Sequence, residues 1–132
     1  MHKVTISGIN LTIVNPREML SMGGPYVGDV SIGDDLISKD CLLNNFVYKE
    51  DTNLLFFVKY HNINYYQYFT INFYNLDTKT VYEFDKEFEK LYIGEFIGKN
   101  ELEMYPAFHD GLKNLQQIFN LDEEEFQEVS KQ

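Results

Sequence analysis

Residues 67–89, QYFTINFYNLDTKTVYEFDKEFE, decide the fold that the sequence predicts. Apolar and polar residues alternate from residue 68 to residue 74, and period-two alternation of aromatic and β-branched residues is typical of a half-buried strand. Residues 75–80 (NLDTKT) suit a turn, because Asp and Thr side chains hydrogen-bond to their own backbone. The stretch therefore predicts a β-hairpin, and its apolar face carries Phe69, Ile71, Phe73, Tyr82, Phe84 and Phe88.

The turn also fixes how the two predicted strands pair. A loop of two or four residues centred on Asp77-Thr78 sets Phe73 opposite Tyr82, so that apolar residues meet apolar ones and polar residues meet polar ones. A slip by one residue would move every side chain of one strand to the other face. Asp-Thr is a poor pair for the positive φ angles of a type I′ turn, so we expect the four-residue loop.

The polar face of the second predicted strand is strongly acidic, with carboxylates at Glu83, Asp85, Glu87 and Glu89. Alternate residues of a strand lie roughly 6.6 Å apart, so the four side chains would form one row. Two interpretations of this row remain open. It is either an ordinary solvated strand face, on which salt screens the mutual repulsion, or a docking surface for a basic partner.

The composition indicates a single domain over residues 1–132 that binds neither nucleic acid nor an anionic membrane. With 44% hydrophobic residues the chain can build a core, and its net charge is −10. Phosphate backbones and anionic lipids both attract clustered positive charge. A basic protein partner is favoured instead, because opposite net charges speed the encounter. Most of the negative charge lies late in the chain, since residues 83–132 hold thirteen acidic and five basic side chains.

Features that mark a cellular compartment predict a cytoplasmic protein. The single cysteine, Cys41, excludes an internal disulfide and suits a reducing compartment. It opens an apolar run (CLLNNF), where a buried thiol is usual. The first residues, MHKVTISGIN, lack the apolar segment of a signal peptide, and no run approaches the roughly 18 apolar residues of a membrane span.

The remaining pattern predicts an α+β, β-rich fold of about seven or eight short, antiparallel strands with a few helices. The apolar run 54–60 (LLFFVKY) indicates a strand covered on both faces, and residues 42–48 would pair with it. Asn15, Pro16 and Glu18 match a capping box at the start of a short early helix. Apolar spacing over 112–119 and the acidic run 122–125 predict one or two helices at the C-terminus.

The sequence contains no motif that predicts catalysis, a metal site or a cofactor. His2, His61 and His109 are too far apart in the chain, and too far from Cys41, to form a local metal signature. The short catalytic motifs G-x-S-x-G, H-E-x-x-H and S-x-x-K do not occur. We therefore expect a binding protein rather than an enzyme, with no catalytic residues.

A small, acidic, Cys-poor chain with many short strands, aromatic-rich faces and a C-terminal helix resembles the immunity proteins of bacterial toxin systems. These include the polymorphic-toxin and contact-dependent growth-inhibition families. The resemblance is one of size, charge, composition and predicted elements over the whole chain, and it rests on no sequence motif. It implies that the protein binds and neutralises a cognate toxin domain, often a basic nuclease.

The resemblance also implies which residues contact the toxin. The acidic row would pair with the Lys and Arg side chains that the toxin uses on nucleic-acid phosphates, and tyrosines in and beside the predicted loop 61–66 (HNINYY) would supply contact area. The implied partner-binding residues are Glu83, Asp85, Glu87, Glu89, Tyr65, Tyr66, Tyr68 and Tyr74. An alternative function is that of a small β-barrel or sandwich protein that binds a small apolar ligand, and it predicts a closed apolar cavity.

Overall fold

The computed structural model describes residues 2–19, 25–109 and 113–129, which form eleven strands and two short 3₁₀ turns. No α-helix occurs within these ranges. The elements in chain order are β1 (His2–Ile6), β2 (Ile9–Glu18), β3 (Tyr26–Ile32), β4 (Asp35–Lys49), β5 (Leu54–Ile63), β6 (Tyr66–Asn75), β7 (Thr80–Phe84), β8 (Tyr92–Phe96), β9 (Glu101–Tyr105), η1 (Lys113–Leu115), β10 (Gln117–Asn120), η2 (Leu121–Glu123) and β11 (Phe126–Val129).

The strands form two antiparallel sheets. The larger has eight strands in the order β1-β2-β3-β4-β5-β6-β7-β11, and its first seven strands are a meander in which each pairs with the next along the chain. β11 comes from the far end of the sequence and pairs with the edge of β7. The smaller sheet has three strands in the order β10-β9-β8.

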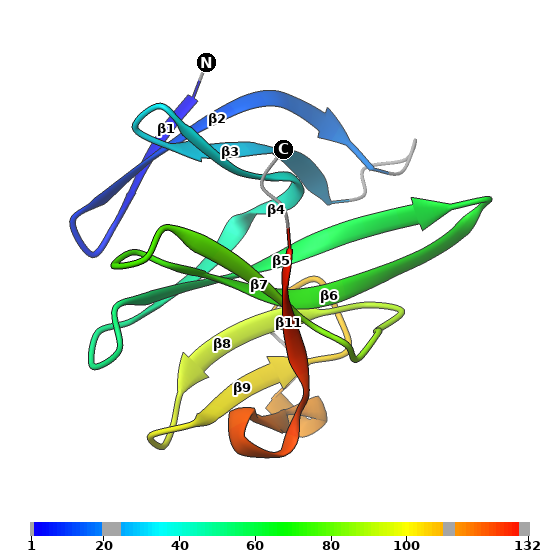
Figure 1. Cartoon of the computed structure of the whole chain (residues 1–132). Helices are drawn as coiled ribbons and strands as arrows, with labels where there is room; N and C mark the ends of the chain where they lie inside the picture. The colour runs from blue at the N-terminus through cyan, green and yellow to red at the C-terminus, as the bar shows by residue number, and fades with distance from the viewer. Residues whose placement is uncertain (1, 20–24, 110–112, 130–132) are drawn as a thin grey trace.

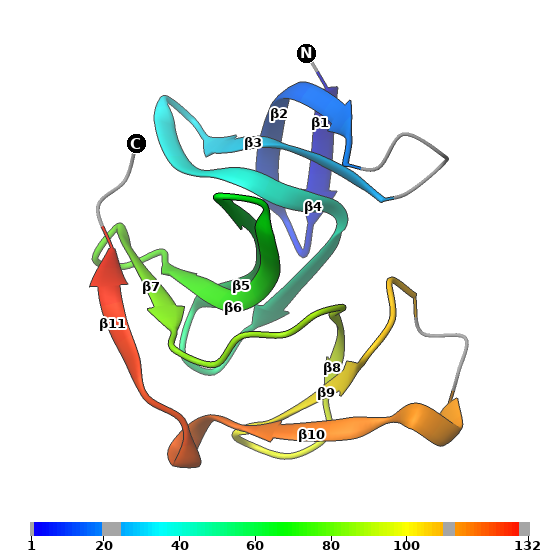
Figure 2. The same ribbon diagram turned by 90° about the vertical axis from the view of Figure 1, so that its right-hand side faces the viewer.

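The β5–β6 hairpin lies between the other elements as a middle layer. Figures 1 and 2 show β1–β3 and the start of β4 on one side of it and β8–β10 on the other, while the end of β4 runs beside β5. An apolar cluster fills the space on each side of the hairpin. Phe56 and Phe57 are neighbours in β5 but belong to different clusters, because Phe56 packs toward β8–β10 and Phe57 toward β2–β4. Both side chains are fully buried. This confirms the prediction that residues 54–60 form a strand covered on both faces.

Irregular pairing in β2–β4 lets the first half of the large sheet bend over the hairpin. The register shifts between Val14 and Arg17 in the β2–β3 pair and between Cys41 and Phe46 in the β4–β5 pair. Such bulges place extra residues in one strand and bend it. Gly28, beside the first shift, has no room for a side chain, since an added Cβ would lie 2.8 Å from a methyl group of Leu43.

The hairpin predicted from residues 67–89 is present as β6 and β7. Phe73 pairs with Tyr82, and a four-residue loop joins the two strands, as predicted. Asn75 closes this loop, because its Oδ1 accepts hydrogen bonds from the backbone N–H groups of Asp77 at 2.9 Å and Thr78 at 3.1 Å. The alternating pattern and the Asx turn therefore specified this register locally.

The predicted loop over 61–66 is wrong, because the strands continue through most of it. β5 extends to Ile63 and β6 begins at Tyr66, so only Asn64 and Tyr65 connect them. The ten pairs from Leu54↔Asn75 to Ile63↔Tyr66 make this the longest regular hairpin among the described residues. Its free end projects beyond the rest of the fold, as the green hairpin at the right of Figure 1 shows.

The predicted early helix is also wrong, since β2 runs through these residues to Glu18. Asn15 has a φ of 54° and lies with Pro16 inside the bulge opposite β3. Proline lacks the N–H that a strand ladder requires, so within sheets it is found at edges and bulges. The Asn15-Pro16 pair therefore matches a helix start in sequence but lies at an irregularity of a strand in the structure.

The C-terminal helices are corrected in the same way, which makes the described part of the chain all-β rather than α+β. Part of the first predicted helix is strand β10, and its expected start, up to residue 112, lies outside the described residues. Asn120 caps only the short turn η2, where its Oδ1 accepts a hydrogen bond from the N–H of Asp122 at 3.0 Å. The acidic run then continues into β11, because the edge of β7 offers it backbone hydrogen bonds.

Candidate functional site

Five of the eight predicted partner-binding residues lie together around the free end of the β5–β6 hairpin, although they come from separate parts of the sequence. The Tyr66 hydroxyl donates a hydrogen bond to Glu87 Oε1 at 2.7 Å. The ring of Tyr68 lies 5.1 Å from that of Tyr66 and stacks on the imidazole of His61 at 4.6 Å, centroid to centroid. Tyr65 stands at the turn itself. We define the tyrosine–carboxylate surface as His61, Tyr66, Tyr68, Glu83 and Glu87.

His61, which sequence reasoning did not select, links the tyrosines to the carboxylates. Its Nε2 lies 2.7 Å from Glu83 Oε2 and 3.0 Å from Thr70 Oγ1. The Thr70 hydroxyl donates to the same Glu83 oxygen at 2.7 Å, so a proton on His61 Nε2 gives this carboxylate a second donor. No local sequence signal reports this contact, because His61 and Glu83 lie on strands separated by β6.

Glu83 is held in its ionised form by this network. Partial burial opposes ionisation, but the hydrogen bonds from His61 and Thr70 outweigh it and hold the pKa of Glu83 below its ordinary value of 4.5. The side chain is only 22% exposed, so the interpretation as an ordinary solvated strand face does not fit Glu83. The carboxylate is instead a fixed negative charge at the base of the surface.

We expect the stability of the protein to depend on Glu83 in the acid range. Its pKa is lower in the folded than in the unfolded chain, so its stabilising contribution is present above the ordinary pKa and is lost as the pH falls through the folded value. Glu83→Gln should flatten the acid limb of a plot of unfolding free energy against pH below about pH 4.5, and should cost roughly 1–3 kcal/mol at neutral pH.

The matched control for this measurement is Glu89→Gln, which removes an exposed carboxylate from the same segment. It should change the unfolding free energy by less than about 0.5 kcal/mol. Urea titrations from neutral pH to pH 3 would measure both variants. An unchanged acid limb in Glu83→Gln would show that the His61–Glu83–Thr70 network contributes nothing to folding.

Tyr65 lies just beyond the tyrosine–carboxylate surface, at the turn, and the other three predicted residues do not lie near it. Tyr74 is buried, and its hydroxyl donates to Asp35 Oδ2 at 2.9 Å. Asp85 lies beside β11, where its backbone N–H donates to the carbonyl of Glu125 at 2.9 Å. Glu89 is exposed and lies outside any strand. The single acidic row is therefore wrong, because β7 ends one residue before Asp85.

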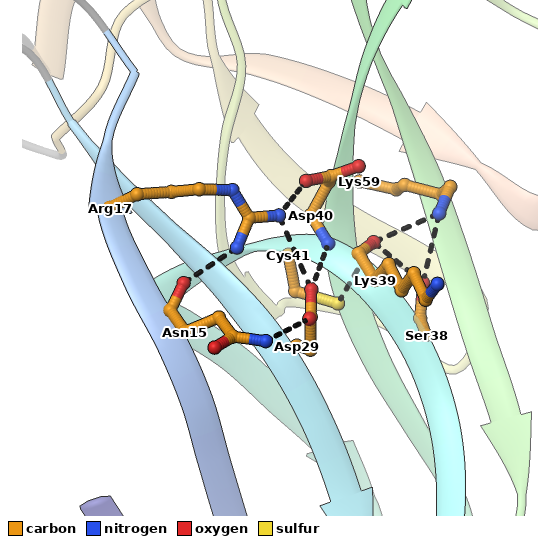
Figure 3. Close-up of polar contacts among 8 residues, drawn as sticks. All are labelled: Asn15, Arg17, Asp29, Ser38, Lys39, Asp40, Cys41 and Lys59. Atoms are coloured by element: carbon orange, nitrogen blue, oxygen red, sulfur yellow. Dashed lines mark hydrogen bonds and ion pairs between the residues drawn. The ribbon is translucent and has the colours of Figure 1, made fainter. Parts of the chain in front are cut away.

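A second charged cluster, centred on Asp29 of β3, was missed by sequence reasoning (Figure 3). Arg17 on β2 forms ion pairs with Asp29, at 3.2 Å, and with Asp40 on β4. Asp29 also accepts hydrogen bonds from Asn15 Nδ2 at 3.1 Å and from the backbone N–H of Asp40 at 3.3 Å. Asn15 and Asp40 both have positive φ angles, 54° and 59°. The available signal was Pro16 within an alternating strand, which marks a bulge.

The physical role of this cluster is to hold three bent strands together. Burial opposes the ionisation of Asp29, but its donors prevail and its pKa lies below the ordinary 3.8. Burial lowers the pKa of Arg17, but its bonds to Asp40 and Asp29 outweigh that effect and the pKa lies above its ordinary value.

The neighbouring Cys41 is fully buried, and burial raises the pKa of its thiol to about 12. A thiol of this pKa is not a nucleophile at neutral pH.

A cavity of about 270 Å³ lies between the two polar regions and is bordered by Asp40, Lys59, Asn72 and Glu83. Asn72 is almost fully buried, and its Nδ2 donates to the hydroxyl of Thr70 at 2.9 Å. Its Oδ1 has no hydrogen-bond partner among the described residues. One water molecule would satisfy this oxygen. The cavity is also lined by Ile37, Val81 and Val129, so its wall combines apolar side chains with these polar groups.

Comparison with known proteins identifies no relative of this chain. No protein-family model, no curated protein and no solved structure matches it. Within the described ranges, no helix is long and apolar enough to cross a membrane, and no group of three or more His, Cys, Asp or Glu side chains is placed to hold a metal ion. A functional interpretation therefore depends on the geometry of the polar surfaces alone.

Proposed function

We propose that this chain is a binding protein of the immunity type, which neutralises a cognate, basic bacterial toxin domain by covering it with the tyrosine–carboxylate surface. The observation that carries the proposal is the joining of Tyr66 to Glu87 and of Tyr68, through His61, to Glu83. The aromatic side chains of the projecting β5–β6 hairpin thus lie next to the negative charge of Glu83 on β7 and of Glu87, which follows β7. This is the chemistry that a basic, nucleic-acid-binding surface on a toxin would meet.

Charge and contact area would have separate roles in such a complex. The net charge of −10 and the exposed Glu87 would steer a basic partner, so the association rate would be fast and would fall with salt. Tyrosines supply large, rigid contact area with a polar end, and desolvated aromatic anchors set the lifetime of a complex. The toxin's Lys and Arg side chains, once paired with Glu83 and Glu87, would no longer be free to hold phosphates.

The proposal predicts that Glu87→Lys slows association with the toxin. The chain would be expressed with the product of the gene immediately upstream, and the purified pair would be studied by surface plasmon resonance. Reversing one exposed charge within the steering field should lower the association rate about tenfold at low salt, and much less at high salt.

The matched control is Glu50→Lys, which makes the same charge change in the β4–β5 loop, at the other end of β5 from the tyrosine–carboxylate surface. At physiological salt its association rate should stay within about a factor of two of wild type, because Glu50 then lies beyond the roughly 8 Å screening length from the interface, and at low salt its effect should remain smaller than that of Glu87→Lys. Equal effects of Glu87→Lys and Glu50→Lys would contradict the proposed surface.

A further inference from the structure

The turn between β5 and β6 has an unusual residue at a conformationally demanding position. Ile63 pairs with Tyr66, so Asn64 and Tyr65 form a two-residue turn, and their φ angles are 51° and 68°. Positive φ at both central positions is the geometry of a type I′ turn, for which Asn-Gly is the favoured pair. Asn64 fits this rule. Tyr65 does not, because a bulky side chain at positive φ is strained.

A second two-residue turn in the same chain can be compared with this one. Ser7 and Gly8 join β1 to β2 through another two-residue turn, with φ angles of 48° and 85°, between the paired residues Ile6 and Ile9. Here the second position is glycine, as the geometry favours. The same chain therefore adopts the unstrained solution at one hairpin and departs from it at Tyr65.

Among the described residues, no packing contact compensates for the strain at Tyr65. Its side chain is 95% exposed, so it neither packs on the hairpin nor fills a space in the core. The flanking residues Ile63 and Tyr66 are 57% and 58% exposed. Three large side chains are thus presented to solvent, and the hairpin that carries them projects beyond the rest of the fold (Figure 1). We call residues 63–66 the hairpin tip.

Charge distribution around the hairpin tip indicates what it would meet. The strand ends and turn, residues 61–67 (HNINYYQ), contain no Asp, Glu, Lys or Arg, so the hairpin tip carries no formally charged side chain. Just behind it lie the carboxylates of Glu83 and Glu87, held by His61 and Tyr66. A hairpin tip without charged side chains, with carboxylates next to it, is complementary to an apolar cleft whose rim carries basic side chains.

We propose that the hairpin tip inserts into an apolar cleft on the basic partner and that Tyr65 is the residue that anchors the complex. The proposal rests on the function proposed above and goes further, since it separates an anchor from the steering charges. Tyr65 acts on the dissociation rate, while Glu87 acts on the association rate. The strain at Tyr65 is then retained for binding and not for folding.

The decisive variant is Tyr65→Gly, because the proposal predicts opposite changes in stability and in binding. Glycine removes the strain of positive φ, so the melting temperature should rise by about 3 °C. Loss of the anchor should raise the dissociation rate from the upstream gene product by about 30-fold or more. Tyr65→Phe keeps the ring and should stay within a few-fold of wild type in dissociation.

Gly8→Tyr is the matched control, since it creates at the β1–β2 turn what the chain has at the β5–β6 turn. A Cβ added at Gly8 meets no atom within 4 Å, so the main effect of the change is the strain of a side chain at positive φ. It should lower the melting temperature by a similar few degrees and leave the dissociation rate unchanged.

Failure of this inference is distinguishable from failure of the proposed function. If wild type forms no complex with the upstream gene product, both fail together. If wild type binds and Tyr65→Gly dissociates at the wild-type rate, only the anchor is overturned and the steering surface stands. A lower melting temperature in Tyr65→Gly would also overturn the inference, because it would show that Tyr65 serves the fold.

Discussion

Replacing Asn45 by alanine should lower the free energy of unfolding by about 3 kcal/mol, and by as much as roughly 5 kcal/mol if both freed backbone groups stay dry. Asn45 lies in β4 and is buried. Its Oδ1 accepts a hydrogen bond from the backbone N–H of Ile93 at 2.9 Å, and its Nδ2 donates to the carbonyl of the same residue at 2.7 Å. One side chain thus ties the large sheet to β8 of the small one.

The reason for so large an effect is that alanine leaves two buried backbone groups of Ile93 without partners, and a buried polar group that loses its partner costs about 1–3 kcal/mol. Asn44→Ala is the matched control, since Asn44 is the preceding residue and is exposed. It should change stability by less than about 0.5 kcal/mol. Urea unfolding followed by fluorescence would measure both. A midpoint for Asn45→Ala equal to that of Asn44→Ala would contradict the link between the sheets.

Phe56→Ala and Phe57→Ala should each destabilise the protein by about 3–5 kcal/mol, although the two residues are adjacent in one strand. Phe56 packs against Phe73 at 5.2 Å and edge-on to Phe96 of the small sheet at 5.1 Å, between ring centroids. Phe57 lies in the opposite cluster, with residues of β2–β4. Each truncation would leave a cavity in a different core, because the two faces of β5 are covered by different layers.

The pair of variants distinguishes this fold from a two-layer one. In a sheet covered on one face, one of two neighbouring strand residues is exposed, and its truncation changes stability little. Ile63→Ala, at the exposed end of the same strand, supplies the reference and should lose less than about 1 kcal/mol. A small loss for either Phe56→Ala or Phe57→Ala would show that β5 is not the middle layer.

The β6–β7 hairpin could be predicted because all its signals are local. The alternation around Phe73, the turn chemistry after Asn75 and the loop length agree, and together they leave one register. The continuous apolar run of β5 likewise predicts burial on both faces. These parts of the fold depend on residues that are close in sequence.

The helices were predicted from signals that are also local but that tertiary pairing overrode. Asn15-Pro16 and the acidic run after Asn120 both match helix starts, yet each segment lies against a strand edge that offers it backbone hydrogen bonds. A capping sequence stabilises a helix by about 1 kcal/mol, which is less than a strand gains from a full ladder and an apolar face. Residue patterns do not report the presence of a neighbouring edge.

The candidate site likewise contains residues that the sequence could predict and residues that it could not. Tyr66 and Tyr68 were selected as tyrosines in and beside a predicted loop, which the structure replaces by strand, and Glu87 was selected from an acidic pattern. His61 could not be selected, since its contact with Glu83 depends on the extension of β5 into the predicted loop. The Arg17 cluster was hidden for a related reason, because bulges in three strands bring its members together.

Co-purification tests the proposed function most directly. The chain would be expressed with the product of the gene immediately upstream, and complexes would be isolated at low and at high salt. The proposal predicts a stoichiometric complex, and surface plasmon resonance on the purified pair should show an association rate that falls as salt rises, as expected when an acidic surface guides a basic partner. A chain that folds but forms no complex at low salt, or a complex whose association rate does not change with salt, would contradict it.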